Sequence, residues 1–119
     1  MIEAAGILLV SPAGRVLLLK RSSEGDAQGL WALPGGKVEE GESTLQAALR
    51  ETWEELGWRA GGVDRELMRR VKEDVDYTTF VKKVDSEFTP KLNEEHTAWA
   101  WVDPKEVLIE QPPAPVTIQ

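Results

Sequence analysis

Three glutamates, Glu51, Glu54 and Glu55, are spaced so that a helix would carry them on one side, within an arc of about 100°. Like charges on one helix face repel, and a bound divalent cation is the usual compensation. Carboxylates are hard oxygen ligands, the chain has no cysteine, and its single histidine is not well placed in the sequence to join them. The pattern therefore favours Mg²⁺, with Mn²⁺ as a substitute, over zinc.

The residues around these glutamates predict the helix that must position them. Ser43 and Gln46 form a capping-box pair at its start, and Gly57 suits the position just past its end. Apolar and small residues recur at helical spacing on another face: Leu45, Ala48, Leu49, Thr52 and Leu56. One face should therefore pack against the protein while the other presents carboxylates. Ion pairs on the same helix are a weaker explanation for these acids.

The stretch from Gly36 to Trp58 resembles the Nudix box. That motif is a glycine, five residues, a glutamate, seven residues, and then Arg-Glu-hydrophobic-x-Glu-Glu-x-Gly-hydrophobic. Its charged and glycine positions are all matched here, by Gly36, Glu42, Arg50, Glu51, Glu54, Glu55 and Gly57. Thr52 stands where an aliphatic residue is usual. The resemblance implies a metal-dependent hydrolase of nucleoside diphosphates linked to a further group.

The resemblance also implies roles for individual residues. The three clustered glutamates would hold the metal together with a backbone carbonyl of Gly35 or Gly36. Arg50 would orient a glutamate of the box, often Glu51. Glu42 would pair with that arginine or contact the metal through water.

Two further groups of residues are candidates outside the helix. Many Nudix enzymes have an acid on a loop before a late strand, where it reaches the metals or acts as base, and Glu95 fits that position better than Glu94. His96 follows it, and a histidine at a strand start is more often structural. Lys37, after the double glycine, and Arg21, at the end of a predicted strand, are candidates to bind substrate phosphates.

The whole chain fits one small α/β domain. Its 119 residues can bury a single core, and we assign residues 1–110 to the domain and 111–119, with three prolines, to a tail. Segments 2–10 and 15–20 read as a hairpin, and 63–72, 75–84 and about 96–102 as further strands. A last helix is predicted at 104–110. Strands with two helices predict a mixed sheet between helices, and the resemblance implies the Nudix α/β/α sandwich.

Composition narrows the partners. The apolar run 4–10 is too short to span a membrane and has no basic leader, so we expect a cytoplasmic protein. A net charge of −7 disfavours stable nucleic-acid binding. The basic residues of 65–72 are interleaved with acids, which also argues against a nucleic-acid-binding module. A small phosphorylated substrate is compatible with this acidity because a metal reverses the local charge. The sequence leaves open whether two copies form a homodimer.

The minimal length favours a nucleoside triphosphate pyrophosphatase resembling the MutT group, including enzymes that act on oxidised nucleotides. ADP-ribose, dinucleoside polyphosphates and capped RNA are alternative substrates. A Nudix-like domain that senses a nucleotide without cleaving it is an alternative of another class. Such proteins typically lose box carboxylates, whereas Glu51, Glu54 and Glu55 are all retained here.

Overall fold

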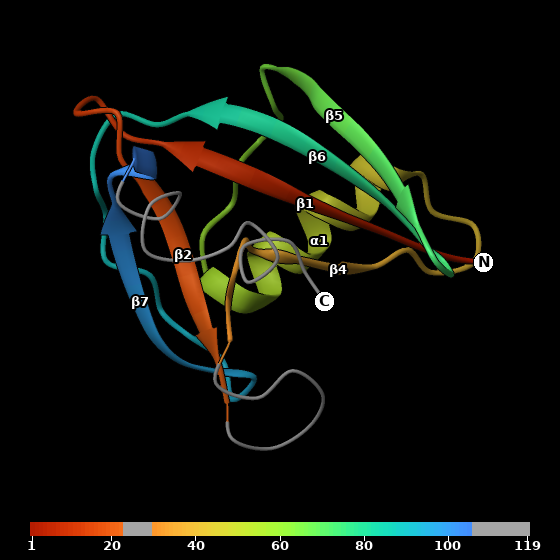
Figure 1. The fold of residues 1–119 in the computed structure, drawn as a ribbon. Helices are drawn as coiled ribbons and strands as arrows, with labels where there is room; N and C mark the ends of the chain where they lie inside the picture. Colours follow the sequence, from red (N-terminus) through yellow and green to blue (C-terminus); the bar gives the residue numbers. More distant parts are fainter. Residues whose placement is uncertain (23–29, 106–119) are drawn as a thin grey trace.

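The computed structural model describes residues 1–22 and 30–105. Over these residues the fold is a seven-stranded mixed sheet with the helix α1 against it (Figure 1). The elements in chain order are β1 (Ile2–Val10), β2 (Val16–Arg21), β3 (Trp31–Ala32), β4 (Gly35–Lys37), α1 (Thr44–Leu56), β5 (Arg65–Lys72), β6 (Val75–Lys83) and β7 (His96–Val102). The predicted mixed sheet and α/β sandwich are confirmed.

Strand β1 is the centre of the sheet. It pairs with β6 in parallel along its whole length, from Ile2 opposite Val75 to Val10 opposite Lys83. On its other side β4 pairs with its first half, and β2 meets it only at Val10 and Val16. The predicted hairpin of β1 and β2 is therefore paired only next to its turn. Further from the turn the two strands separate, and β4 pairs with β1 on the side where β2 would have continued. Strands β7 and β3 pair with the two sides of β2.

The Pro34-Gly35-Gly36 segment leads from β3 into β4. Both glycines belong to β4, whereas β3 pairs with β2 instead of β1. At Gly35 the backbones approach so closely that an added Cβ would lie 2.4 Å from the carbonyl oxygen of Ala5. Glycine is thus required for the chain to pass from one half of the sheet to the other.

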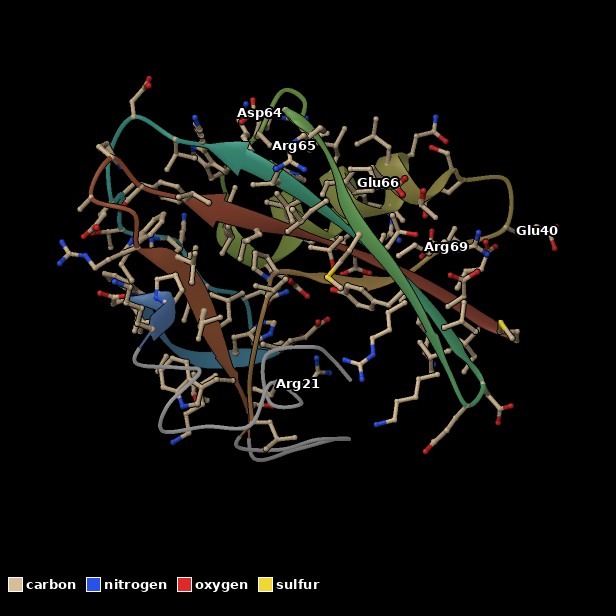
Figure 2. All side chains as sticks on the ribbon, turned by 45° about the horizontal axis from the view of Figure 1, so that its top comes forward. Arg21, Glu40, Asp64, Arg65, Glu66 and Arg69 are labelled. Atoms are coloured by element: carbon tan, nitrogen blue, oxygen red, sulfur yellow. The ribbon has the colours of Figure 1, made fainter. Side chains whose placement is uncertain are left out.

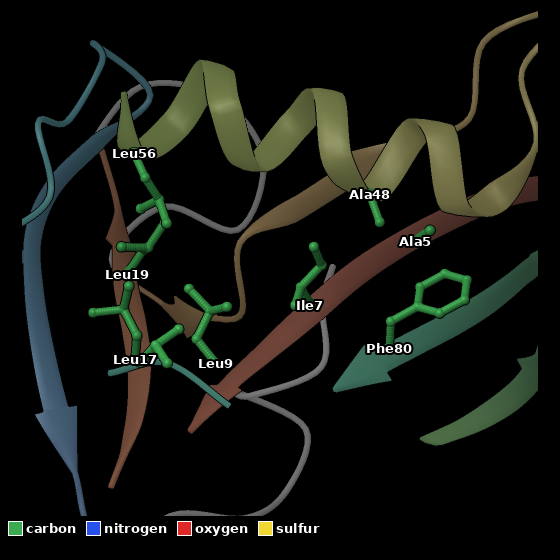
Figure 3. Close-up of a cluster of buried hydrophobic side chains, with 9 residues drawn as sticks. Ala5, Ile7, Leu9, Leu17, Leu19, Ala48, Leu56 and Phe80 are labelled. Carbon is green, nitrogen blue, oxygen red and sulfur yellow. The ribbon is translucent and has the colours of Figure 1, made fainter. Parts of the chain in front are cut away.

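The core lies between β1, β2 and α1. Alternate residues of the two strands, Ile7, Leu9, Leu17 and Leu19, are fully buried and pack with Ala48, Leu56 and Phe80 (Figure 3). This alternation is what a strand with one face toward a helix requires. Trp58 and Trp101 close one end of the core around Phe88, with ring centroids 4.6 Å apart for Trp58–Phe88 and 5.6 Å for Phe88–Trp101.

Helix α1 has the predicted ends. The Ser43 hydroxyl accepts from the Gln46 N–H at 3.0 Å, and the Gln46 side chain accepts from the Ser43 N–H at 2.8 Å. Gly57 ends the helix in the left-handed conformation with φ 62°. The packed face differs from the prediction, because Leu45 is exposed whereas Ala47 and Glu55 are buried. The strands and loops that pack against α1 decide which of its residues are buried, and helical spacing alone does not predict how these lie.

Strand β5 is an edge strand that is exposed along its length. Arg65, Glu66 and Arg69 project from it (Figure 2), and Arg69 Nε donates to Asp76 Oδ1 at 2.8 Å. The turn at residues 73–74 joins it to β6, as predicted. No helix within residues 1–22 and 30–105 is long and apolar enough to cross a membrane.

The predicted last helix begins in the described part of the chain. Residues 104 and 105 are helical, and Asp103 Oδ1 accepts from the Lys105 N–H at 2.9 Å, which is an N-cap contact. Residues 106–110 and the tail 111–119 lie outside the described residues. The assignment of 1–110 to the domain and 111–119 to a tail therefore stays a prediction.

Thr52 provides a test of the packing. It is fully buried in α1, and its hydroxyl oxygen has no hydrogen-bond partner within the described residues. Valine has nearly the same shape without the polar group, so Thr52→Val should raise the free energy of unfolding by about 1 kcal/mol in urea denaturation. Thr44→Val, in the same helix but less buried, is the matched control and should bring no gain. An equal or larger gain from the control would contradict the explanation.

Candidate active site

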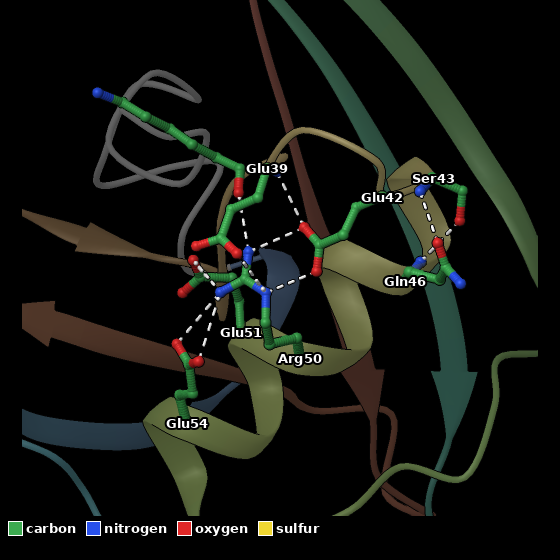
Figure 4. Close-up of polar contacts among 8 residues, drawn as sticks. Glu39, Glu42, Ser43, Gln46, Arg50, Glu51 and Glu54 are labelled. Atoms are coloured by element: carbon green, nitrogen blue, oxygen red, sulfur yellow. Dashed lines mark hydrogen bonds and ion pairs between the residues drawn. The ribbon is translucent and has the colours of Figure 1, made fainter.

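Arg50, in the middle of α1, lies at the centre of a network of acids (Figure 4). Its guanidinium binds Glu42 through two bonds, Nε to Oε2 at 2.6 Å and Nη2 to Oε1 at 3.0 Å. Nη1 donates to Glu51 Oε2 at 3.1 Å, and Nη2 also donates to the carbonyl of Lys37 at 3.1 Å. These bonds connect β4, the following loop and the helix. They hold the pKa of the Glu42 carboxyl below its usual value.

Glu54 also contacts Arg50, which precedes it by four positions in the helix. The distance from Arg50 Nη1 to Glu54 Oε1 is 3.3 Å. An ion pair within the helix therefore accounts for part of the charge of Glu54, although ion pairs on the same helix were expected to be the weaker explanation for these acids. The Glu54 side chain is 47% exposed, so this pair is worth well under 1 kcal/mol. Glu54 is available to a ligand at the surface.

Glu55 is the buried member of the cluster, with 2% of its surface exposed. Its Oε1 accepts the backbone N–H of Gly35 at 2.9 Å. Burial raises the pKa of its carboxyl well above the usual value, the Gly35 N–H opposes that rise, and the charges of Glu51 and Glu95 add to it. A buried carboxylate with one hydrogen bond is costly to ionise, and a cation would offset that cost.

Glu51 lies between Arg50 and the glycine pair. Burial raises the pKa of its carboxyl, while the Arg50 charge and hydrogen bond oppose the rise. A Cβ on Gly36 would be 2.5 Å from the Glu51 Cδ, so the glycine leaves the space that this carboxylate occupies. The spacing within the box thus has a steric reason. It allows the helix acids to lie directly against β4.

Glu95 and His96 meet Glu55 from the other half of the sheet. One ligand atom from each of the three residues lies within 4.8 Å of the others. His96 is 5% exposed, and its Nδ1 has no hydrogen-bond partner in the described part of the chain. Burial, with a smaller contribution from Arg21, lowers its pKa to about 4, so the imidazole is neutral at pH 7. The view that the histidine is not well placed to join the acids was wrong. Its position depends on the pairing of β7 with β2, which the sequence does not show.

The two predicted phosphate-binding cations are placed differently. Lys37 is exposed on β4, directly after the glycine that faces Glu51. Arg21 ends β2 opposite His96 in the strand register, and its charge lowers the pKa of both Glu55 and His96 (Figure 2). Both therefore border the acid cluster. Their contact with a substrate stays a prediction.

Tyr77, on β6, lies close to a glycine of β1 and a glycine of β4. A Cβ added to Gly6 would lie 2.2 Å from its hydroxyl oxygen, and one added to Gly35 would lie 2.9 Å from it. Burial raises the pKa of this phenol, and the charges of Glu55 and Glu51 raise it further. Tyr77 is thus a neutral hydroxyl beside the acid cluster. Gly6 in β1 leaves the space that the Tyr77 hydroxyl occupies. The sequence does not reveal this relation, because it depends on the parallel register of β1 and β6.

Known protein families and solved structures contain similar sequences and folds. The NUDIX domain model matches residues 2–118, so the chain belongs to the NUDIX family. The family resemblance read from the sequence is confirmed, and with it the assignment to the hydrolases of this family.

Three similar proteins illustrate the relationship. The CTP pyrophosphohydrolase of Escherichia coli K12 is 36% identical over 120 residues, which cover 99% of this chain and 87% of that protein. The crystal structure of a MutT protein from Methanosarcina mazei Go1 has a TM-score of 0.74 at 29% identity, over 92% of this chain and 82% of that one. A C. elegans Ap4A hydrolase structure has a TM-score of 0.76 at 25% identity, over 92% and 85% of the two chains.

The acid cluster fits the divalent cation that the family implies. Glu51 and Glu55 have raised pKa values because they are buried near one another and near Glu95, which is the arrangement that a cation stabilises. The nature of the ion, and a contribution from the carbonyl of Gly35 or Gly36, stay predictions.

The network around Arg50 can be tested with a lysine that keeps the charge. Arg50→Lys loses the two-bond pairing with Glu42 and the simultaneous contact with Glu51, so we expect the free energy of unfolding to fall by about 1–3 kcal/mol. Arg59→Lys is the control, because Arg59 instead lies over the Trp53 ring, 4.2 Å from its centroid. Urea denaturation should show a clear loss for the first variant only. Equal losses would mean that the network is not specific.

Proposed function

We propose that this protein is a magnesium-dependent pyrophosphohydrolase that cleaves nucleoside triphosphates to a nucleoside monophosphate and pyrophosphate. The observation that carries the proposal is the buried Glu55 carboxyl. Its pKa is raised, as is that of Glu51, and the charges of Glu51 and Glu95 both act on it. Glu51 is paired with Arg50, whereas Glu55 is buried with a backbone N–H as its hydrogen-bond partner, and a bound cation would offset the cost of ionising it. A nucleotide-sensing role is less well supported because all three box carboxylates are present.

Glu51, Glu54 and Glu55 would hold the cation, with a backbone carbonyl of Gly35 or Gly36. A bound Mg²⁺ supplies positive charge against the phosphate oxygens and eases removal of a proton from water. Arg50 would position Glu51 through the Nη1–Oε2 bond instead of contacting the substrate. Because Glu42 and the Lys37 carbonyl hold Arg50 in turn, the orientation of Glu51 is set before any ligand arrives.

The remaining residues act on the phosphates and on water. Lys37 and Arg21 border the cluster as cations and would bind the negatively charged phosphate chain. Glu95 is exposed and lies beside Glu55, which supports a role as the base that would accept the proton of the attacking water. The water oxygen would bond to one of the two phosphorus atoms that the cleaved bridge joins. The bond from that phosphorus to the bridging oxygen would break, and the leaving group would keep the bridging oxygen and the electron pair. The leaving group is pyrophosphate or the nucleoside monophosphate, according to which phosphorus is attacked.

The choice of a nucleoside triphosphate is supported by the similarity to the E. coli CTP pyrophosphohydrolase, which covers nearly the whole chain. Dinucleoside polyphosphates are the second candidate, because the fold also matches the Ap4A hydrolase from C. elegans. Oxidised nucleotides, ADP-ribose and capped RNA belong in the same test. We propose the cytoplasm as the place of this activity.

Glu55→Gln separates the cation site from the fold. The amide keeps an acceptor for the Gly35 N–H but removes the buried charge, so the variant without metal should be at least as thermally stable as the parent protein at pH 7. Turnover should fall at least about 100-fold. Mg²⁺ should raise the melting temperature of the parent and not of the variant. Glu40→Gln, at an exposed loop position (Figure 2), is the control and should behave as the parent. Near-normal turnover in Glu55→Gln would remove Glu55 from the metal site.

The substrate class can be read from a panel with Mg²⁺ that measures phosphate and pyrophosphate release. The panel contains nucleoside triphosphates, 8-oxo-dGTP, ADP-ribose and diadenosine polyphosphates, and we expect the highest kcat/KM for a triphosphate. Lys37→Ala should raise KM for that substrate with little change in stability, whereas Lys72→Ala on the distant edge strand β5 should not. An unchanged KM in Lys37→Ala would exclude the phosphate contact.

A further inference from the structure

His96 is an unusual neighbour for a carboxylate cluster. It is 5% exposed at the start of β7, and its Nδ1 is buried without a hydrogen-bond partner among the described residues. A buried polar nitrogen left unpaired has lost its hydrogen bonds to water without replacement, which destabilises the folded protein. A bound ligand at this position would remove that cost.

The spacing of the cluster fits a single ion. One donor atom each from Glu55, Glu95 and His96 lies within 4.8 Å of the other two. Ligand atoms that surround one cation at about 2.0–2.6 Å are themselves at most about 5 Å apart. Glu55 uses Oε1 for the Gly35 N–H, so its other oxygen remains for the ion. The three donors come from α1, from the loop before β7 and from β7 itself.

The charges around the cluster favour a cation. Glu51 and Glu95 both act on Glu55, and Arg21 is the positive charge that faces it. Arg50 pairs with Glu51, so Glu55, Glu51 and Glu95 face two guanidinium groups, and Arg50 is shared with Glu42 as well. A divalent ion is therefore attracted even though Arg21 weakens the attraction.

We infer that Glu55, Glu95 and His96 form a mixed nitrogen–oxygen site that binds a transition-metal ion such as Mn²⁺ in preference to Mg²⁺. Imidazole nitrogen is a poor ligand for Mg²⁺ but a good one for first-row transition metals, and carboxylates suit both Mg²⁺ and Mn²⁺. The site differs from the all-oxygen set of Glu51, Glu54 and Glu55 by its nitrogen. The inference rests on the proposed function in that Glu55 belongs to both sets.

The direct test is pulsed electron paramagnetic resonance of the protein loaded with Mn²⁺, without nucleotide and without any added histidine tag. A coordinated imidazole gives a ¹⁴N modulation of the Mn²⁺ signal. Because the chain has one histidine, that modulation can come only from His96. We expect it in the parent protein and not in His96→Gln. Its absence from the Mn²⁺-loaded parent would overturn the inference, whether or not the variant folds.

Calorimetric titrations with Mn²⁺ and Mg²⁺ give the selectivity. His96→Gln should weaken Mn²⁺ binding at least about tenfold and change Mg²⁺ binding much less. Glu95→Gln should also weaken Mn²⁺ binding, whereas Glu94→Gln, the adjacent exposed acid, is the matched control and should not. Unchanged Mn²⁺ affinity in a folded His96→Gln, or equal losses for the two metals, would contradict the nitrogen ligand.

These measurements use no substrate, so they are separable from the proposed function. Nitrogen-coordinated Mn²⁺ in a protein that hydrolyses nothing in the panel would support this site and remove the proposed reaction. Turnover without the ¹⁴N signal would support the reaction and remove this site.

Discussion

The structure depends on the buried contact between the Glu55 carboxylate and the backbone N–H of Gly35. This bond joins α1 to β4, and β4 in turn pairs with the central strand β1. Gly35 must lack a side chain to approach β1, so the position of the carboxylate is set by the sheet as much as by the helix. Any group that binds Glu55 therefore acts on the connection between helix and sheet.

Around this contact the charges are divided into two unequal parts. Glu42 and Glu51 share the positive charge of Arg50 in the middle of the helix, which connects the loop to the helix without a ligand. Glu55 and Glu95 have no comparable arginine hydrogen bond in the described chain, and the nearby Arg21 only partly reduces their repulsion. Glu42 and Glu51 thus connect the loop and the helix through Arg50. Glu55, by contrast, is buried near other carboxylates, which makes its ionised form unfavourable. The second group, Glu55 and Glu95, is the one whose mutual repulsion a bound cation would offset.

Much of this arrangement could be predicted from local sequence. The capping residues of α1, the glycine at its end and the clustered glutamates are separated by a few positions, so helical geometry relates them directly. The placement of His96 and Tyr77 could not be predicted in this way, because each depends on the register of strands that are distant in sequence. Leu45 and Glu55 show the same limit, since helical spacing does not say how strands and loops pack against the helix.

The parallel pairing of β1 with β6 also has a consequence for biosynthesis. The first strand obtains its one long partner, β6, only after residues 75–83 have been made. Until then Ile7 and Leu9, which end fully buried, have an open edge beside them. Such long-range pairing slows folding and leaves apolar strands exposed on a growing chain. A nascent chain of this protein should therefore be a client for chaperones that hold its N-terminal strand until β6 leaves the ribosome.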